Sequence, residues 1–218
     1  MLKACIFDMD GVLVDTAKHH FRAWHRMAAT LSIPFTEEQN EELKGVSRVD
    51  SLEKILSWGN LVLDNHKKHE LMEIKNKWYL EYVNEIKSSD MLPGTQRFLS
   101  ELKVAHIKLG LGSSSKNSML ILDKLGLRDL FDSIVDGNKI HFSKPHPEVF
   151  LKAAQELNVH PSEAVVFEDA VSGVDAAKAG GFYCVGIGRK EVLANADFVI
   201  GSLNEINLEK LKVEITSS

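Results

Sequence analysis

Short apolar runs separated by longer amphipathic stretches set the pattern of this sequence. The runs are apolar on successive residues and rich in Val, Ile and Phe, which is typical of strands buried on both faces of a parallel sheet. Helical spacing fills the stretches between them, so the alternation predicts a doubly wound α/β fold. The predicted strands are Lys3–Phe7, Ile107–Gly112, Ser133–Val135, Ala164–Phe167, Tyr183–Ile187 and Phe198–Ile200, and the predicted helices are Gly94–Lys103, Lys116–Leu125, Pro147–Leu157 and Gly173–Ala179.

Residues 15–87 break this alternation, because no run there predicts a strand. Apolar residues instead recur at helical spacing: Phe21, Trp24, Ala28 and Leu31, then Leu52, Ile55 and Leu56, then Leu71, Ile74 and Trp78. We therefore expect an α/β core of residues 1–14 and 88–218, and an inserted all-helical unit of residues 15–87. The junctions near Asp15-Thr16 and Lys87–Ser89 are the expected hinges between them.

Composition narrows the class of protein. The 218 residues are 44% hydrophobic and 26% charged, which excludes disordered and fibrous classes. The net charge of −5 argues against nonspecific binding to nucleic acid or to an anionic membrane. No apolar run approaches the roughly 18 residues of a membrane helix, and no signal peptide is recognised. Two cysteines in apolar runs are typical of reduced core thiols, so we expect a cytoplasmic protein.

Two pairs of carboxylates follow predicted strands. Asp8 and Asp10 end the first strand, and the alternation of side chains along an extended chain places both on the same side. Glu168 and Asp169 end a second buried strand. Ligands bind at this edge of open α/β sheets, and carboxylates gathered there suit a hard cation, with Mg²⁺ beside a phosphate the best match. The alternative for the first pair is a solvated turn.

Two further motifs suit a phosphate. The segment Ser113–Asn117 leaves a strand and enters a helix, where hydroxyls, free N–H groups and the helix N-terminus attract an anion. Lys144, in a Ser-Lys-Pro sequence before another helix, offers a compact positive charge. Each signal is weak alone, because serines at helix starts are usually N-caps and Lys-Pro is usually a surface turn.

In the order Asp-x-Asp, Ser, Lys and Glu-Asp, these motifs resemble the haloacid dehalogenase superfamily of aspartate-nucleophile phosphotransferases. The resemblance implies a Rossmann-like core with a helical cap. It also implies that Asp8 is a nucleophile that forms an aspartyl phosphate and that Asp10 is the general acid and base. Ser113 and Lys144 would hold the transferring phosphoryl group. The implied Mg²⁺ site consists of Asp8, Asp10 through its backbone carbonyl, Glu168 and Asp169.

The helical insert has a narrower resemblance, to the β-phosphoglucomutases. Residues 16–24 are similar to the first cap helix of that family, and residues 44–52 to its substrate-specificity loop. The resemblance implies interconversion of β-D-glucose 1-phosphate and D-glucose 6-phosphate through β-D-glucose 1,6-bisphosphate, which also acts as activator. The implied substrate- and phosphate-binding residues are Thr16, His20, Trp24, Gly45, Val46, Ser47, Arg48, Ser51, Lys75, Ser113, Ser114, Ser115, Lys116, Asn117 and Lys144.

Individual cap residues carry expectations of their own. Arg48 would clamp the phosphate that is not being transferred, because a guanidinium binds phosphate oxygens in pairs. His20 and Lys75 are expected near Asp10 when the cap closes. Ser114 departs from the family pattern, in which a smaller residue such as Ala is expected. The histidines expected at the surface are His19, His25, His66 and His69.

Two other functions stay open. A sugar-phosphate phosphatase would share the core motifs, although the segment Lys44–Ser51 favours a mutase. A noncatalytic α/β binding module belongs to a different class, and binding alone needs no nucleophile such as Asp8. In every case the expected partner is a small sugar phosphate, and we expect the protein to be a monomer that binds neither nucleic acid nor membrane.

Overall fold

The computed structural model describes residues 2–217, and in this part of the chain six parallel strands form one sheet. The strand order is β3-β2-β1-β4-β5-β6, so the first strand lies inside the sheet and the chain winds outward on both sides of it. The strands are β1 (Ala4–Phe7), β2 (Lys108–Gly112), β3 (Ser133–Val135), β4 (Ala164–Glu168), β5 (Tyr183–Ile187) and β6 (Phe198–Ile200). All six predicted strands are confirmed to within one residue at each end.

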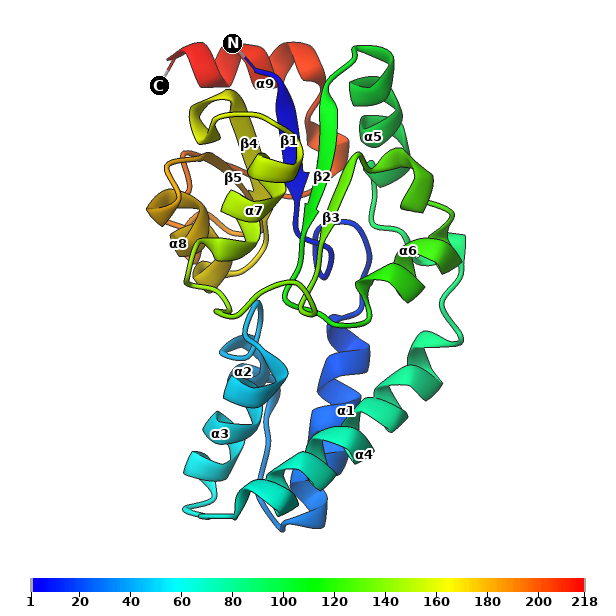
Figure 1. The fold of residues 1–218 in the computed structure, drawn as a ribbon, viewed down its shortest axis with the longest axis vertical. Helices are drawn as coiled ribbons and strands as arrows, with labels where there is room; N and C mark the ends of the chain where they lie inside the picture. Colours follow the sequence, from blue (N-terminus) through cyan, green and yellow to red (C-terminus); the bar gives the residue numbers. More distant parts are fainter. Residues whose placement is uncertain (1, 218) are drawn as a thin grey trace.

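Helices cover both faces of this sheet and form a second lobe below it (Figure 1). The helices of the second lobe are α1 (Ala17–Thr30), α2 (Glu37–Glu41), α3 (Arg48–Trp58) and α4 (Asn65–Val83). Those of the sheet lobe are α5 (Thr95–Val104), α6 (Ser118–Leu125), α7 (Glu148–Glu156), α8 (Val171–Ala179) and α9 (Leu208–Ser217). Single turns of 3₁₀ helix span Ser88–Asp90, Arg128–Leu130, Pro161–Glu163 and Leu203–Glu205.

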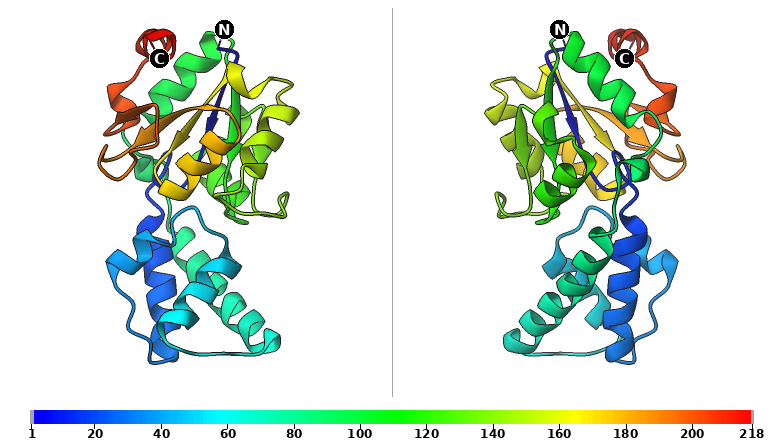
Figure 2. Two further views of the ribbon diagram at one scale, coloured as in Figure 1. Left: turned by 90° about the vertical axis from the view of Figure 1, so that its left-hand side faces the viewer. Right: turned by 90° about the vertical axis from the view of Figure 1, so that its right-hand side faces the viewer.

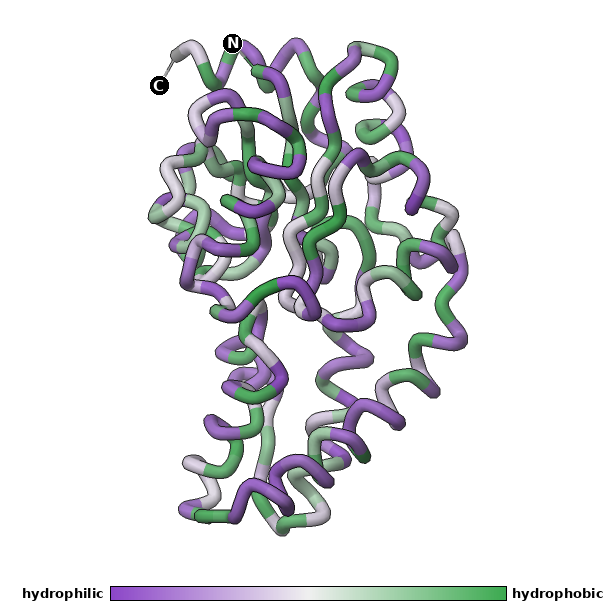
Figure 3. Tube along the Cα trace, in the orientation of Figure 1, coloured by the Kyte–Doolittle hydropathy of each residue, from purple (hydrophilic) through white to green (hydrophobic). Residues whose placement is uncertain are grey.

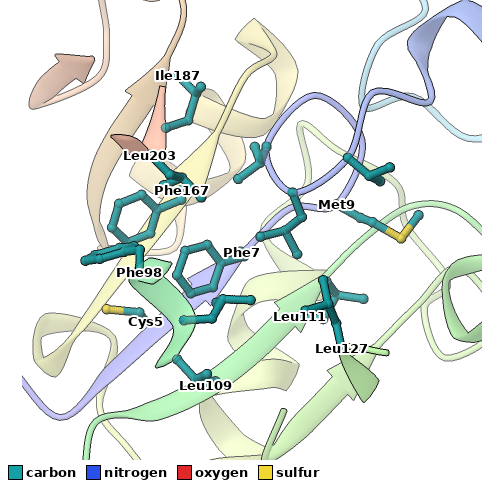
Figure 4. Close-up of a cluster of buried hydrophobic side chains, with 14 of the residues drawn as sticks. Cys5, Phe7, Met9, Phe98, Leu109, Leu111, Leu127, Phe167, Ile187 and Leu203 are labelled. Atoms are coloured by element: carbon teal, nitrogen blue, oxygen red, sulfur yellow. The ribbon is translucent and has the colours of Figure 1, made fainter. Parts of the chain in front are cut away.

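Two apolar clusters fix the helices to the sheet. Leucines, phenylalanines and isoleucines of α5, α6 and α9 pack on one face, and α7 and α8 pack on the other. On the first face Phe7 stacks on Phe167 with ring centroids 4.7 Å apart, and Phe98 meets both rings edge-on (Figure 4). In Figure 3 the hydrophobic positions gather along the strands, whereas the surrounding loops are mostly hydrophilic. This burial on both faces explains why the strands are apolar on successive residues.

The lower lobe has its own small core. Residues 17–87 form helices and single turns without a strand, as the sequence predicted. Trp24, Met27, Ile55 and Leu71 are among its buried residues. Helix α1 packs along α4, and the side views in Figure 2 show the lobe as a separate helical body below the sheet.

Helix α4 buries a different stripe from the predicted one. Ile74 is exposed, whereas Leu71, Lys75 and Tyr79 are buried, at a spacing of four residues. His19 on α1 is also buried, which corrects the prediction of a surface position; its ring stacks on Tyr82 of α4.

The chain crosses between the lobes twice, and the two crossings lie side by side. Val14 forms an antiparallel bridge with Met91, and the Leu92 N–H donates to the Leu13 carbonyl at 2.9 Å. These paired segments lie at the junctions that the sequence predicted as hinges. None of the helices described is both long and apolar enough to cross a membrane.

Candidate active site

A cleft of about 490 Å³ lies between the C-terminal edge of the sheet and the helical lobe. Its lining combines residues from the ends of β1 and β4, the loop after β2, and the facing segments of α1, α3 and α4. The predicted residues that line it are Asp8, Asp10, His20, Trp24, Gly45, Val46, Ser47, Arg48, Ser51, Lys75, Ser114, Ser115, Lys116, Asn117 and Asp169. Four others do not line it and are buried: Thr16, Ser113, Lys144 and Glu168.

Lys144 joins two carboxylates beneath the cleft. The side chain is 1% exposed, and its Nζ donates to Asp8 Oδ1 at 2.5 Å and to Glu168 Oε1 at 2.6 Å. Burial alone would lower the pKa of Lys144, but the charges of Asp8 and Glu168 outweigh it and raise the pKa. Lys144 is therefore a permanent cation beside Asp8, where it can offset the charge of a phosphoryl group.

Glu168, which the sequence predicts as a metal ligand, accepts two hydrogen bonds within the protein. Its Oε1 accepts from Lys144, and its Oε2 accepts from the Ala170 N–H at 2.8 Å. Both oxygens are thus engaged within the protein. The structure gives Glu168 the task of holding Lys144, because a buried lysine needs more than one acceptor for its three protons.

Asp169 turns toward the cleft. Its Oδ2 lies 3.8 Å from Lys44 Nζ, and its carboxylate packs so closely on Gly11 that a Cβ there would overlap it. Burial, and then the charges of Glu168 and Asp8, hold the pKa of Asp169 well above its ordinary value. At the end of the sheet the three acids Asp8, Glu168 and Asp169 thus face the two lysines Lys144 and Lys44.

Asp10 faces the cleft from the turn after β1. The Thr16 hydroxyl donates to Asp10 Oδ1, and His20 Nε2 lies 4.0 Å from the same oxygen. Burial raises the pKa of Asp10 to about 7, and the charge of Asp8 acts in the same direction. A carboxyl group that titrates near neutral pH can both give and take a proton.

Lys75 reaches the cleft from the buried side of α4. Its ammonium lies between the rings of Trp24 and Tyr79, 4.4 and 4.9 Å from their centroids, and 3.3 Å from His20 Nδ1. Burial, and after it the charge of Arg48, lower the pKa of Lys75 to about 7. His20 is held neutral in turn, because burial and the neighbouring Lys75 keep its pKa well below the ordinary value.

Arg48 is the first residue of α3 and is held in place by α4. Its Nη2 donates to Asn76 Oδ1 at 2.8 Å, and the Asn117 amide donates to the same oxygen at 3.0 Å. Glu73 lies 3.6 Å from Nη1. Asn76 thus brings Arg48 of the helical lobe beside Asn117 of the sheet lobe, where the two can bind one anion.

The segment after β2 is a turn rather than the predicted helix start. Helix α6 begins at Ser118, not Lys116. The Ser113 hydroxyl is fully buried and accepts from the Ser115 N–H at 3.1 Å, and Ser115 Oγ accepts from the Asn117 N–H at 3.2 Å. The hydroxyls therefore shape the turn and place Lys116 and Asn117 at the cleft.

Sequence reasoning left several cleft residues out of the predicted site. Lys44 and Asn76 line the cleft beside predicted residues, and Tyr79 covers Lys75. Lys44 directly precedes the predicted Gly45, and Asn76 directly follows the predicted Lys75. Their positions in the sequence could therefore have pointed to the site. Nothing in the sequence marks Tyr79, because a tyrosine on a helix is usually a core residue.

Comparison with known proteins gives consistent similarities. Residues 2–181 match the model of the haloacid dehalogenase-like hydrolase family. The chain is 42% identical to a β-phosphoglucomutase from Bacillus subtilis over 98% of this chain and 95% of that protein. It is 36% identical to a phosphorylated carbohydrates phosphatase from Thermotoga maritima over 83% of this chain and 82% of that one. The crystal structure of a β-phosphoglucomutase from Clostridium difficile superposes with a TM-score of 0.97 at 40% identity, covering 100% of this chain and 98% of that one.

Proposed function

The chain belongs to the haloacid dehalogenase-like hydrolase family, and from that premise we propose that it catalyses the β-phosphoglucomutase reaction. This reaction interconverts β-D-glucose 1-phosphate and D-glucose 6-phosphate through β-D-glucose 1,6-bisphosphate. One observation supports the proposal: a single cleft is lined by Asp8 of the sheet lobe and by Arg48 of the helical lobe, and Asn76 joins Arg48 to Asn117. We propose Asp8 as the nucleophile, and Arg48 with Asn117 as the site of the second phosphate. A bisphosphate that turns round between half-reactions needs both sites.

We propose that residues 15–87 act as the cap and residues 1–14 and 88–218 as the catalytic core. The Asp8 carboxylate attacks a phosphorus atom of the bisphosphate, so a phosphorus–oxygen bond forms to Asp8 and the bond to the sugar oxygen breaks. Asp10 donates its proton to the leaving sugar oxygen. D-glucose 6-phosphate then leaves and β-D-glucose 1-phosphate binds. In the second half-reaction its C6 hydroxyl attacks the phosphorus of the aspartyl phosphate and gives its proton to Asp10, the bond to Asp8 breaks, and the bisphosphate is formed again.

The donor set at the end of the sheet fits Mg²⁺. Its groups are all oxygen donors, and they carry surplus negative charge that a divalent cation would offset. Asp8, Asp169 and the Asp10 carbonyl would hold the ion. Among residues 2–217 no three His, Cys, Asp or Glu side chains form a ready-made cage, which suits a cation that keeps several waters. The bound cation would reduce the repulsion between Asp8 and the phosphoryl group.

One assay tests the proposed function. Enzyme, Mg²⁺, a trace of β-D-glucose 1,6-bisphosphate and β-D-glucose 1-phosphate are incubated, and D-glucose 6-phosphate is measured against free phosphate. We expect D-glucose 6-phosphate to dominate, with activity lost in excess EDTA. Free phosphate as the main product would favour a phosphatase, which the similarity to the Thermotoga maritima protein makes the second candidate.

The position of Asp10 predicts a pH dependence. Because its pKa is raised to about 7, the protonated acid that serves phosphoenzyme formation from the bisphosphate is lost as pH rises through about 7. We expect this step to slow above pH 7 and Asp10→Asn to slow it by about 10²–10⁴-fold with a flat profile. Rapid-quench measurement of phosphoenzyme from pH 5.5 to 8.5 checks this. An unchanged profile in Asp10→Asn would assign the acid to another group.

Substitution of Arg48 tests binding of the second phosphate separately from the chemistry at Asp8. Arg48→Ala is expected to lower kcat/KM for the sugar phosphate by at least roughly tenfold, since a charge-assisted hydrogen bond contributes about 1.5–3 kcal/mol. Phosphorylation of Asp8 by acetyl phosphate should fall much less, because that donor has no second phosphate. Arg48→Lys should recover only part of the loss. Equal losses with both donors would make Arg48 a structural residue of the cap.

A further inference from the structure

Three serine hydroxyls of the sheet lobe contact one short segment of the helical lobe. Ser114 Oγ, after β2, donates to the Gly45 carbonyl at 2.9 Å. Ser172 Oγ, in the first turn of α8, donates to the Lys44 carbonyl at 3.0 Å. Ser143 Oγ, before α7, donates to Asp50 Oδ2 at 2.7 Å. The hydroxyls come from two loops and the start of one helix, and each hydrogen bond crosses from one lobe to the other.

The bonds of Ser114 and Ser172 differ from the third in their acceptor. Both hydrogen bonds are partly buried, and their acceptors are adjacent backbone carbonyls. When the helical lobe lies against the sheet lobe, these buried carbonyls need a donor. Asp50 is exposed, and its carboxylate also accepts from Ser47 at 2.6 Å. The Ser143 bond also joins the lobes, but it is exposed and can be replaced by water at little cost, whereas the two partly buried carbonyl bonds cannot.

Gly45 supplies the backbone shape that these bonds require. Its φ of +71° is a conformation that favours glycine, and a Cβ there would lie 2.5 Å from Ser172 Oγ. Segment 44–45 therefore approaches the sheet lobe closely enough for two hydroxyls to reach successive carbonyls. The only ion pair between this segment and the sheet lobe among the described residues joins Lys44 to Asp169 at 3.8 Å.

We propose that Ser114 and Ser172 are positioning residues that latch Lys44 and Gly45 onto the sheet lobe and keep water from the aspartyl phosphate at Asp8 while a sugar phosphate is bound in the closed cleft. The inference rests on the proposed function and deepens it, because the latch sets the ratio of phosphoryl transfer to hydrolysis. The Ser114 hydroxyl donates toward the helical lobe, so its contribution is separate from that of the cleft residues that bind phosphate. Closure also places Arg48, three residues beyond Gly45.

Amide hydrogen exchange tests the latch without reference to activity. A neutral hydrogen bond of this kind changes an equilibrium by roughly 2- to 12-fold. In the full chain with Mg²⁺, the Ser114→Ala and Ser172→Ala double variant should therefore exchange its amides in residues 44–47 several-fold to tens of times faster than the parent. Ser57→Ala is the matched control, because Ser57 donates to the Lys54 carbonyl within the helical lobe. Unchanged exchange at residues 44–47 in the double variant overturns the latch.

Turnover gives the second arm of the test. With β-D-glucose 1-phosphate and the bisphosphate, the double variant should release several-fold more free phosphate per D-glucose 6-phosphate formed, and Ser57→Ala should match the parent. A variant with Ser172→Thr in place of Ser172→Ala keeps the hydroxyl, and its ratio of free phosphate to D-glucose 6-phosphate should return most of the way to that of the parent. An unchanged ratio alongside faster exchange would overturn the role in excluding water. If the parent itself forms no D-glucose 6-phosphate, the proposed function fails, while the exchange arm still decides the latch.

Discussion

Asp8→Asn is expected to abolish the phosphoenzyme and to lower turnover by roughly 10⁴-fold or more, because the amide is not a nucleophile toward phosphorus. The change is nearly isosteric, and the amide oxygen can still accept the hydrogen bond that Lys144 donates to Asp8 in the parent. The fold should therefore be kept while the chemistry is lost. This combination distinguishes a nucleophile from a residue that only shapes the cleft.

Intact-protein mass spectrometry after exposure to acetyl phosphate and Mg²⁺ measures the result. The parent should gain one phosphoryl group and Asp8→Asn none. Asp15→Asn is a matched control at the edge of the helical lobe, where Asp15 pairs with Lys18 at 3.3 Å. It should be phosphorylated like the parent. A phosphorylated Asp8→Asn variant would place the nucleophile elsewhere.

Lys144→Met should produce the largest loss of stability among single substitutions in the site. Removing the ammonium leaves Asp8 and Glu168 buried without their shared partner, and breaking a buried ion pair in this way costs about 3–5 kcal/mol. Methionine keeps a similar volume, and its thioether can replace the cation–π contact that Nζ makes with the Phe150 ring, 4.7 Å from the centroid in the parent. The loss is thus electrostatic rather than a cavity effect.

The sign of the pH dependence follows from the same contacts. In the parent the pKa of Lys144 is raised, so its contribution to stability is present below the ordinary lysine pKa and is not lost near neutrality. In the variant the pKa of Glu168, already raised by burial, loses the Lys144 charge that lowers it. A raised carboxyl pKa favours the folded state at low pH, and that contribution is lost as pH rises.

Urea unfolding at pH 5.5 and pH 8 should therefore show a larger deficit for Lys144→Met at pH 8. Lys178→Met is the control, because Lys178 forms an exposed ion pair with Asp197 at 2.6 Å and should cost less than about 1 kcal/mol. A deficit for Lys144→Met that is equally small at both pH values would show that the buried ion pair adds little.

The strands were predictable because burial on both faces leaves a direct mark on the sequence. Runs such as Cys5–Phe7 and Val165–Phe167 are apolar on every residue. A short strand that is buried on both faces of a parallel sheet requires such a run. Helix α9 carries a weaker signal, since it packs on the sheet lobe through the buried Leu208 and Leu211 and the partly buried Ile215 alone. It was absent from the predicted elements for that reason.

The cleft residues were predictable as a set but not in their individual tasks. Glu168 and Asp169 are adjacent acids, and side-chain alternation at a strand end does not say which one turns inward. Only Lys144, 24 residues away, decides it by engaging Glu168. His19 shows the same limit, because it was expected at the surface and lies on the buried face of α1.

The paired crossings at Val14 and Met91 bear on how such an enzyme could diversify. The chain leaves the core and returns to it at neighbouring points, because Val14 and Met91 pair about 5 Å apart, the spacing of paired strands. An insert with adjacent ends can be lengthened, shortened or exchanged without altering the register of the sheet that carries Asp8. If the proposed cap residues set substrate preference, that preference is physically uncoupled from the phosphoryl chemistry, and one can be remodelled while the other is retained.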